Sequence, residues 1–322
     1  MQALQIIEPG RAELIEAPTP EPSEGEVLVK VLGISTCPHW DIHMMTGEPM
    51  FPGQNVTYPL TPGQPGHEMT GEVVAVGPGV SAPAVGTRVA AWQDRGGNVA
   101  QGCYAQYVAF RTESLMTVAP NLEPHRIASL ELAMCVQVSF DQLVPSDTIR
   151  GKRFGVSGLG PAGLIAVQMA KACGAAEVIG IDPLVERRDA ADRLGADRVI
   201  PADEDLPAGR FAPTALDAAI DCTGLKLSIE YLIGRTRRVV AIFGVLREEV
   251  IFPSDCWRGG FALLGYGSHN RNAAEQAYEL IVKGDLDLAP LITQRLPLGR
   301  YIEGVNLLRN REAIKILFAP WD

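Results

Sequence analysis

The stretch "TCPHWDIHMMTGEP", residues 36–49, places a cysteine, two histidines and an aspartate close together. Further along, "PGHEMTGEVVAVG" has His67 and Glu68 side by side. Thiolate sulfur, imidazole nitrogen and carboxylate oxygen are the ligand atoms that zinc takes in proteins, and a catalytic zinc keeps one exchangeable position. Cys37, His67 and Glu68 are therefore candidate metal ligands. Spacing alone leaves a second interpretation open, namely a buried apolar cysteine and an ordinary surface histidine.

A glycine-rich turn is the second chemical feature. "VSGLGPAG" places Gly158, Gly160 and Gly163 in GxGxxG spacing, after the strand-like "KRFGVSG" and before the helical pattern "PAGLIAVQMAKACG". The first glycine permits the tight turn, the second lets the backbone approach a pyrophosphate, and the third lets helix and strand pack closely. The helix N-terminus then points free N–H groups at the phosphates. The predicted contacts are Gly158, Leu159, Gly160, Pro161, Ala162 and Gly163.

An acid follows at the spacing that a dinucleotide site requires. Asp182 lies 19 residues after Gly163, at the end of "EVIGID". A carboxylate at this place accepts hydrogen bonds from the adenosine ribose hydroxyls and repels a 2′-phosphate, which favours NAD over NADP. Arg187 and Arg188 come just afterwards and soften that preference. Arg187, and Thr223 in "DAAIDCTG", are further cofactor-binding candidates.

The elements that must position these residues differ between the two parts of the chain. The first ~110 residues are rich in Gly, Pro and Val, and "GEVLVKVLGIS" and "TGEVVAVG" are typical of short strands, which predicts a small β-barrel. From about residue 150, strands alternate with helices of about ten residues. That alternation predicts βαβ units and a parallel sheet, so the fold class is α/β.

Bulk composition excludes several classes of protein. The chain has 322 residues, enough for two domains, and a net charge of −10, without the basic stripe of a nucleic-acid-binding protein. No apolar run approaches the roughly 20 residues of a membrane span, and the first residues lack a secretion pattern. We therefore expect a cytoplasmic protein. The six cysteines form no CxxC pair, which indicates thiols or metal ligands instead of disulfides.

Taken together, these motifs give the chain a resemblance to the medium-chain zinc-containing alcohol and polyol dehydrogenase family. "GHE" with "TGEVVAVGPGV" resembles its zinc signature, and "GCYAQYV" resembles its GGxAEY strand. "VSGLGPAG", "EVIGIDP" and the C-terminal "LPLGRYIEGVNLLRNREAIKILFAP" also resemble family motifs, so the match runs from about residue 2 to residue 320. The resemblance implies a GroES-like β-barrel catalytic domain over residues 1–140. It also implies a Rossmann NAD-binding domain with a doubly wound parallel sheet over 141–287, and a return to the first domain over 288–322.

The resemblance also assigns metal ligands. Cys37 and His67 match zinc ligands, and Glu68 matches an acid that binds zinc directly in some states. The remaining ligand of the family is a Cys or Glu at the start of an interdomain helix, where "ASLELAMCVQVSF" offers Glu131 and Cys135. Four residues apart on a helix, they share a face. We favour Cys135, because with Ser139 it looks like the family's cysteine that is followed four residues later by Thr or Ser.

The first cysteine motif departs from the family pattern. The usual run is Cys-x-Ser/Thr-Asp-x-His, whereas here "CPHWDIH" is one residue longer. Asp41 is expected to orient a ligating histidine. His43 is expected at the outer end of a proton relay, and His39 stands about where the relay's hydroxyl is missing. Either His39 is the first relay member, or it packs beside Trp40. His39 and His43 are thus the candidate catalytic residues.

The number of metal ions follows from a missing motif. Family members often carry a structural zinc on a lobe with four closely spaced cysteines, but between Arg88 and Tyr107 this chain has only Cys103. We therefore predict one catalytic zinc and no structural zinc per chain.

The predicted activity is hydride transfer between an alcohol or polyol and NAD. Two alternatives remain: a zinc-free quinone or enoyl reductase on the same fold, and a non-catalytic NAD-binding redox sensor. The expected partners are a small alcohol, polyol or carbonyl substrate, with no nucleic acid and no membrane. The family suggests a homodimer or homotetramer, joined in part through Rossmann strands such as "FALLGYG".

Overall fold

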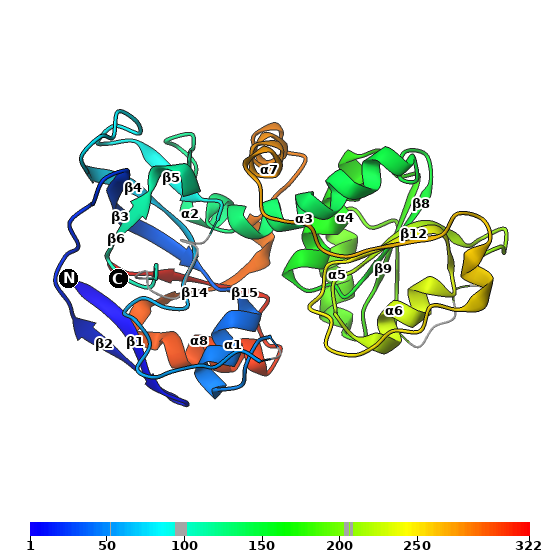
Figure 1. The fold of residues 1–322 in the computed structure, drawn as a ribbon, viewed down its shortest axis with the longest axis horizontal. Coiled ribbons are helices and arrows are strands. Elements are labelled where there is room, and N and C mark those ends of the chain that lie inside the picture. Colours follow the sequence, from blue (N-terminus) through cyan, green and yellow to red (C-terminus); the bar gives the residue numbers. More distant parts are fainter. Residues whose placement is uncertain (52, 94–101, 203–205, 207–208) are drawn as a thin grey trace. The chain divides into compact units, whose positions relative to one another are not determined.

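A computed structural model gives the structure of residues 1–51, 53–93, 102–202, 206 and 209–322. It separates into two compact units, Met1–Leu132 with Leu288–Asp322, and Ala133–Asp287. The helix α3 (Leu130–Leu143) contains both this boundary and the one expected after residue 140. The C-terminal segment therefore belongs to the same unit as the N-terminal segment (Figure 1).

The first unit is built on antiparallel strands. Its elements are β1 (Gln2–Glu8), β2 (Arg11–Glu16), β3 (Glu26–Ser35), α1 (Pro38–Thr46), β4 (Glu68–Val76), β5 (Arg88–Ala91), β6 (Tyr107–Arg111), β7 (Leu115–Thr117), α2 (Pro124–Ile127), β14 (Ile292–Pro297), α8 (Tyr301–Arg309) and β15 (Lys315–Ala319). Short 3₁₀ turns connect some of them, at Thr112–Ser114, Ala289–Leu291 and Leu298–Arg300. Within the described residues, its larger sheet has seven strands in the order β14-β15-β3-β4-β5-β7, with β6 also paired to β3.

The centre of this sheet positions the predicted metal ligands. Strand β3 alternates buried and half-buried residues, as expected of a strand with one face on the core. It pairs antiparallel with β4, so that Ser35 lies opposite Glu68, and with β15, so that Ser35 also lies opposite Leu317. The end of β3, the start of β4 and the middle of β15 therefore lie side by side in the sheet.

The second unit contains the predicted parallel sheet. Its strands are β8 (Arg153–Ser157), β9 (Glu177–Ile181), β10 (Arg198–Ile200), β11 (Leu216–Asp221), β12 (Thr236–Ile242) and β13 (Ala262–Leu264). Its helices are α4 (Pro161–Ala172), α5 (Val185–Arg193), α6 (Lys226–Ile233) and α7 (Arg271–Lys283), together with most of α3 and 3₁₀ turns at Val144–Ser146 and Ser254–Trp257. The described strands are all parallel, in the order β10-β9-β8-β11-β12-β13, which confirms the Rossmann-type prediction.

The strand order creates a place for a ligand. After β8, the chain adds β9 and β10 on one side and then crosses to β11 on the other side. In open α/β sheets, ligands bind at the carboxyl ends of the strands at such a switch point. The helix α4 begins there, with Gly160 as its N-cap and Pro161 in its first turn. Gly174, with φ +82°, closes the chain just beyond its end, as the sequence indicated.

One described helical stretch, Pro124–Ser146, is long and apolar enough to cross a membrane by length and composition, although inspection of the sequence found no such run. In the structure, 78% of its apolar window is buried inside the protein. That burial is the behaviour of a core helix, because a soluble protein also surrounds its central helix with apolar contacts.

Candidate metal centre and cofactor site

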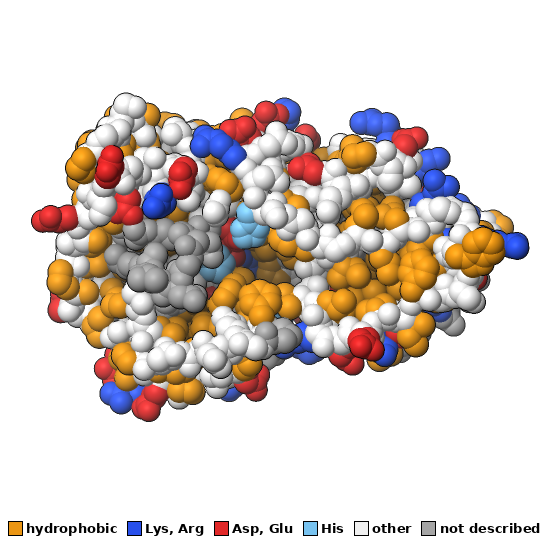
Figure 2. Space-filling model, in the orientation of Figure 1, with side chains coloured by type: hydrophobic (Ala, Val, Ile, Leu, Met, Phe, Trp, Pro, Cys, Tyr) orange, Lys and Arg blue, Asp and Glu red, His pale blue; other side chains and the backbone are white. Residues whose placement is uncertain are grey.

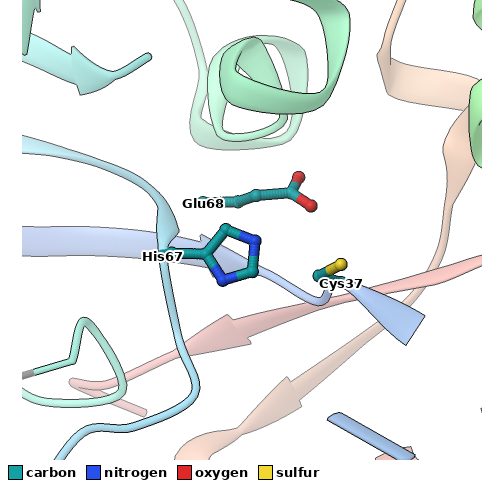
Figure 3. A group of neighbouring side chains, drawn as sticks. All are labelled: Cys37, His67 and Glu68. Atoms are coloured by element: carbon teal, nitrogen blue, oxygen red, sulfur yellow. The ribbon is translucent and has the colours of Figure 1, made fainter. Parts of the chain in front are cut away.

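Three predicted ligands converge in the first unit. Cys37 is the N-cap of α1, two residues beyond β3, and Glu68 is the first residue of β4, opposite Ser35. The register of β3 against β4 thus brings the cysteine beside His67 and Glu68. One ligand atom from each of the three side chains lies within 4.8 Å of the others. Figure 3 shows the three side chains gathered at the ends of these strands.

The imidazole of His67 is oriented by the backbone. Its Nδ1 lies 2.9 Å from the carbonyl oxygen of Pro65, which accepts its proton. In a neutral imidazole this leaves the lone pair on Nε2, the nitrogen that a metal would take. Ligating histidines usually donate their other N–H in this way. The orientation and tautomer of His67 that a metal ligand needs are therefore fixed by a backbone carbonyl and not by a carboxylate.

The charges around His67 suit a cation. Burial by itself lowers the pKa of His67, but the hydrogen bond and negative charge of Cys37, with the carboxylates of Glu131 and Glu68, raise it well above the usual value. The same anionic groups that stabilise an imidazolium would stabilise a divalent metal ion in its place. A thiol, an imidazole and two carboxylates therefore fit zinc both in ligand type and in charge.

Glu68 has a cationic partner that the sequence did not reveal. Lys315 in β15 donates from Nζ to both carboxylate oxygens, at 2.8 and 2.7 Å, and both side chains are fully buried. Burial raises the pKa of Glu68, while the ammonium group of Lys315 opposes that rise. Lys315 thus fixes the Glu68 carboxylate at the edge of the ligand cluster.

The fourth predicted position has two candidates. Glu131, in the first turn of α3, is buried, and its Oε2 lies 3.9 Å from Nε2 of His67. Cys135, in the second unit, has its Sγ 3.4 Å from Nε2 of His269. His269 was missed by the sequence analysis, and its only signal is a position shortly after the last parallel strand. The contact with His67 makes Glu131 the better-supported ligand of the two.

Asp41 does not have the partners expected from the sequence. Its carboxylate accepts hydrogen bonds from the hydroxyl of Tyr104, at 2.8 and 2.9 Å, and from that of Tyr301, at 2.8 Å. Burial raises the pKa of Asp41 to about 6, although both hydroxyls lower it. The two tyrosine hydroxyls therefore fix this carboxylate, and the carbonyl oxygen of Pro65 orients His67 instead.

The two candidate relay histidines share one face of α1. Their ring centroids are 6.0 Å apart, as expected for positions four residues apart on a helix. His43 is buried, with Nδ1 3.2 Å from the carbonyl oxygen of Glu48, whereas His39 is exposed. The Trp40 ring lies edge-on to the His67 ring at a centroid distance of 6.5 Å. The helix therefore places an inner and an outer histidine next to each other, with Trp40 beside the metal ligand.

In the second unit, the three glycines have three different surroundings. Gly158 has φ +85°, and an added Cβ would lie 2.6 Å from Cγ2 of Thr223. A Cβ on Gly163 would lie 1.8 Å from the carbonyl oxygen of Gly158, so close packing requires this glycine. A Cβ on Gly160 would meet no described atom within 4 Å. The open space at Gly160, at the start of α4, suits a pyrophosphate that approaches the backbone.

Asp182 is held in place by the backbone. Its Oδ2 accepts from the N–H of Leu159 at 2.8 Å, and its Oδ1 accepts from the N–H of Leu184 at 2.9 Å. Each oxygen keeps a lone pair that can accept a further hydrogen bond. Arg188 donates to the carbonyl oxygens of Asp182 and Pro183, at 2.7 and 2.8 Å, while Arg187 lies half-buried on α5.

Thr223 follows β11 and is fixed by Asp221. The Thr223 hydroxyl donates to the Asp221 carboxylate at 2.7 Å, which also accepts from the N–H of Gly224 and the hydroxyl of Ser228. Asp221 is completely buried at the end of β11. The sequence analysis missed this residue, although an aspartate that ends an apolar strand was a usable signal. Asp182, Thr223 and the glycine turn all lie at carboxyl ends of the parallel strands.

The prediction that no structural zinc is present concerns the segment between Arg88 and Tyr107. Residues 94–101 of that segment lie outside the described residues. The prediction therefore stays one for chemical analysis.

Comparison with known families assigns both units. Residues 23–120 match the family described as "Alcohol dehydrogenase GroES-like domain". Residues 161–283 match the family described as "Zinc-binding dehydrogenase". These two ranges contain the candidate ligands Cys37, His67 and Glu68 and the last three residues of the glycine turn, Pro161, Ala162 and Gly163.

Whole-chain relatives agree with these domains. The chain is 30% identical to the L-threonine 3-dehydrogenase of Pyrococcus horikoshii, over 99% of this chain and 98% of that protein. It is 28% identical to the (R,R)-butanediol dehydrogenase of Bacillus subtilis, over 96% of both. A Sinorhizobium meliloti structure, described as a candidate zinc-binding dehydrogenase bound to NADP, has a TM-score of 0.84 and 25% identity, with 99% of each chain covered.

Proposed function

Because this chain belongs to the medium-chain zinc-containing alcohol and polyol dehydrogenase family, we propose that Cys37, His67 and Glu131 hold its catalytic zinc. The chain is an oxidoreductase that uses zinc and a nicotinamide dinucleotide to interconvert an alcohol and a carbonyl compound. The main support for this proposal is that ligand atoms of Cys37, His67 and Glu68 all lie within 4.8 Å of one another. Glu131 is added as the third ligand because its Oε2 lies 3.9 Å from Nε2 of His67. Cys135 remains the alternative for that position.

Zinc, when bound, supplies a Lewis acid that lowers the pKa of an alcohol hydroxyl, and the nicotinamide supplies the hydride acceptor. The residues of the chain provide the rest. Pro65 fixes the His67 ring, and Lys315 holds Glu68 at the edge of the cluster. His43, with His39 outside it, moves the released hydroxyl proton toward solvent, since an imidazole can both accept and donate a proton.

A direct test combines metal analysis with activity. The wild-type protein should contain about one zinc per chain and reduce NAD with members of an alcohol and polyol panel. Cys37→Ser should lose both zinc and activity, whereas Cys173→Ser, a matched change in α4's flanking residue, should retain both. Zinc retained in Cys37→Ser would remove Cys37 from the ligand set. Zinc-independent reduction of quinones or enones would instead support the reductase alternative.

For the cofactor, we propose NAD in preference to NADP. The support is the buried carboxylate of Asp182, which the backbone holds in a fixed position. Its remaining lone pairs can accept hydrogen bonds from ribose hydroxyls, and its negative charge repels a 2′-phosphate. Asp182→Ala should weaken NAD binding and improve NADP binding. A wild-type preference for NADP would contradict the proposal and would assign the dominant role to Arg187 and Arg188.

For the substrate, we propose that the carbon chain of the alcohol contacts Trp40. The Trp40 ring is near His67 and also lies 5.9 Å, edge-on, from the ring of the exposed Phe51. Each methylene group buried against such a surface contributes about 0.8 kcal/mol. In a series of straight-chain alcohols, kcat/KM should rise with chain length, and Trp40→Ala should flatten that rise. An unchanged slope would exclude the contact.

We also propose a homodimer or homotetramer in the cytoplasm. Strand β13 pairs with β12 on one edge, and no described strand pairs with its other edge. Exposed apolar side chains occur in the same unit, among them Ile251, Phe252 and Trp257, and Figure 2 shows hydrophobic side chains on its visible face. Light scattering should give a multiple of 34.6 kDa, and Trp257→Asp should reduce it. All six cysteines are free, which supports a reducing compartment.

A further inference from the structure

We propose that a cavity in the first unit binds a small organic anion, with its carboxylate on Arg88 and its apolar body against the surrounding side chains. The cavity has a volume of about 470 Å³ and lies among β3, β5, α2, β14 and β15. Its lining shares no residue with the Cys37, His67 and Glu68 cluster. It is therefore a separate site, and the proposal does not depend on the proposed reaction.

Arg88 is the residue that points to an anion. Its Nη2 donates to the carbonyl oxygen of Leu122 at 3.3 Å, but its buried Nε has no hydrogen-bond partner among the described residues. A buried donor left without an acceptor costs about 1–3 kcal/mol. An acceptor oxygen in the cavity would remove that cost, and a carboxylate would do so with a charge-assisted bond.

Arg88 also forms no ion pair with a described carboxylate. Glu72 is its neighbour across β4 and β5, and Glu123 lines the same cavity, yet neither forms such a pair with it. Arg295, also in the lining, pairs with Asp322 at 3.1 Å. In a chain with net charge −10, this is a local site where a guanidinium is available to a negative ligand.

The remaining walls define the rest of the ligand. Apolar side chains line much of the cavity, among them Leu32, Pro124, Ile292 and Leu317. An inorganic anion would leave these surfaces without a partner, whereas a short aliphatic chain would cover them. The chemical class that fits is a small monocarboxylate with a hydrocarbon tail.

A cavity in the second unit provides a comparison, because the arginines in its lining do form ion pairs. The 610 Å³ cavity of the second unit also contains arginines, but Arg153 pairs with Glu177 at 2.6 Å and Arg237 with Asp217 at 3.1 Å. Both of these arginines are therefore already paired within the protein, while Lys152 also lines this cavity. The Arg88 cavity differs, because Arg88 forms no ion pair with a described carboxylate.

The test uses butyrate and the zinc-loaded wild-type protein, titrated at constant ionic strength by isothermal calorimetry. Butyrate should bind saturably, and butyramide, which has the same shape without the charge, should bind at least about tenfold more weakly. Arg88→Gln should lower butyrate affinity by at least about tenfold, with Arg111→Gln, an exposed arginine of β6, as the unchanged control. Butyrate affinity that persists in Arg88→Gln would place the anion at the metal and overturn the proposal.

A second measurement does not depend on a variant. In methyl-labelled wild-type protein, butyrate should shift the methyl signals of Leu32, Ile292 and Leu317, which line the cavity. The methyl signals of Ile179 and Ile220, in the parallel sheet of the second unit, should stay unchanged. Saturation without shifts at the three lining residues, or no saturable binding at all, would refute the site.

Discussion

Lys315 and Glu68, separated by 247 positions in the sequence, form a fully buried ion pair at the candidate metal centre. Removing one partner of such a pair leaves an uncompensated buried charge, at a cost of about 3–5 kcal/mol. We expect Lys315→Met to lower the free energy of unfolding, measured in urea, by about this amount. Glu68→Gln in the same background should restore part of it.

The control for this prediction is a surface pair. Lys283 and Glu279 lie 3.2 Å apart with both side chains largely exposed, and exposed pairs contribute about 0–1 kcal/mol. Lys283→Met should therefore have little effect on unfolding. Equal effects of the two lysine substitutions would contradict the role assigned to Lys315.

The choice between Glu131 and Cys135 can be decided by metal content. Since Glu131 approaches His67 in the structure, Glu131→Gln should lose most of its zinc, whereas Cys135→Ser should keep it. Zinc per chain, measured by mass spectrometry after dialysis, checks this prediction. The opposite result would make Cys135 the ligand, as the resemblance of its sequence run to the family motif favoured.

Asp41 predicts a specific dependence of stability on pH. Its pKa in the folded protein, about 6, lies above the ordinary value of 3.8, so the folded state binds the proton more tightly than the unfolded state. The stabilising contribution is complete below the ordinary value and is lost as the pH rises through about 6. The difference amounts to about 3 kcal/mol at most.

Asp41→Asn removes this titration while its amide oxygen can still accept from Tyr104 and Tyr301. We expect the variant to be more stable than the wild type at pH 7 and to lose the decline between pH 4 and 6. Thermal unfolding across this pH range provides the measurement. A parallel decline in both proteins would assign the pH dependence to other groups.

Gly160 and Gly163 should respond differently to the same substitution. An added methyl group at Gly160 meets open space, so Gly160→Ala should fold normally but bind the dinucleotide at least about tenfold more weakly. An added methyl group at Gly163 collides with the backbone of Gly158, so Gly163→Ala should lower the melting temperature. Cofactor titration and thermal unfolding of both variants separate the two roles. Dinucleotide affinity in Gly160→Ala equal to that of the wild type would show that no ligand occupies the open space at Gly160.

The proton relay is testable by the pH dependence of kcat. Removing a general acid–base group typically costs about a hundredfold to ten-thousandfold in rate. His39→Ala should lower kcat for alcohol oxidation most at low pH, where proton release is hardest, with zinc content and NAD affinity unchanged. His125→Ala, outside α1, serves as the control. If only His43→Ala is impaired, the relay bypasses His39, and His39 merely packs beside Trp40.

The parts of the site that could be predicted from the sequence were those that short sequence motifs specify. The glycine turn and Asp182 lie on consecutive elements of one βαβ unit, so their spacing in sequence determines their spacing in space. The family resemblance supplied Cys37, His67 and Glu68, which the register of two adjacent strands brings together.

Pairings between distant segments were not predictable. Tyr301 reaches Asp41 across 260 positions, and no periodicity within either segment indicates that contact. The direction of the Asp41 side chain depended on α1, a helix that the sequence analysis did not expect, so its predicted partner was wrong. Lys315 could likewise not be predicted as the partner of Glu68, because the residues around a lysine in an apolar strand do not indicate which carboxylate it contacts.

Because the chain returns to its first unit after residue 287, the two units are completed at different times during translation. The second unit is one continuous segment and is complete once Asp287 has left the ribosome. The first unit lacks β14 and β15 until residues 292–319 have been translated, so the buried carboxylate of Glu68 has no ammonium partner during that time. The nascent protein therefore acquires its cofactor-binding half before its metal-binding half can close.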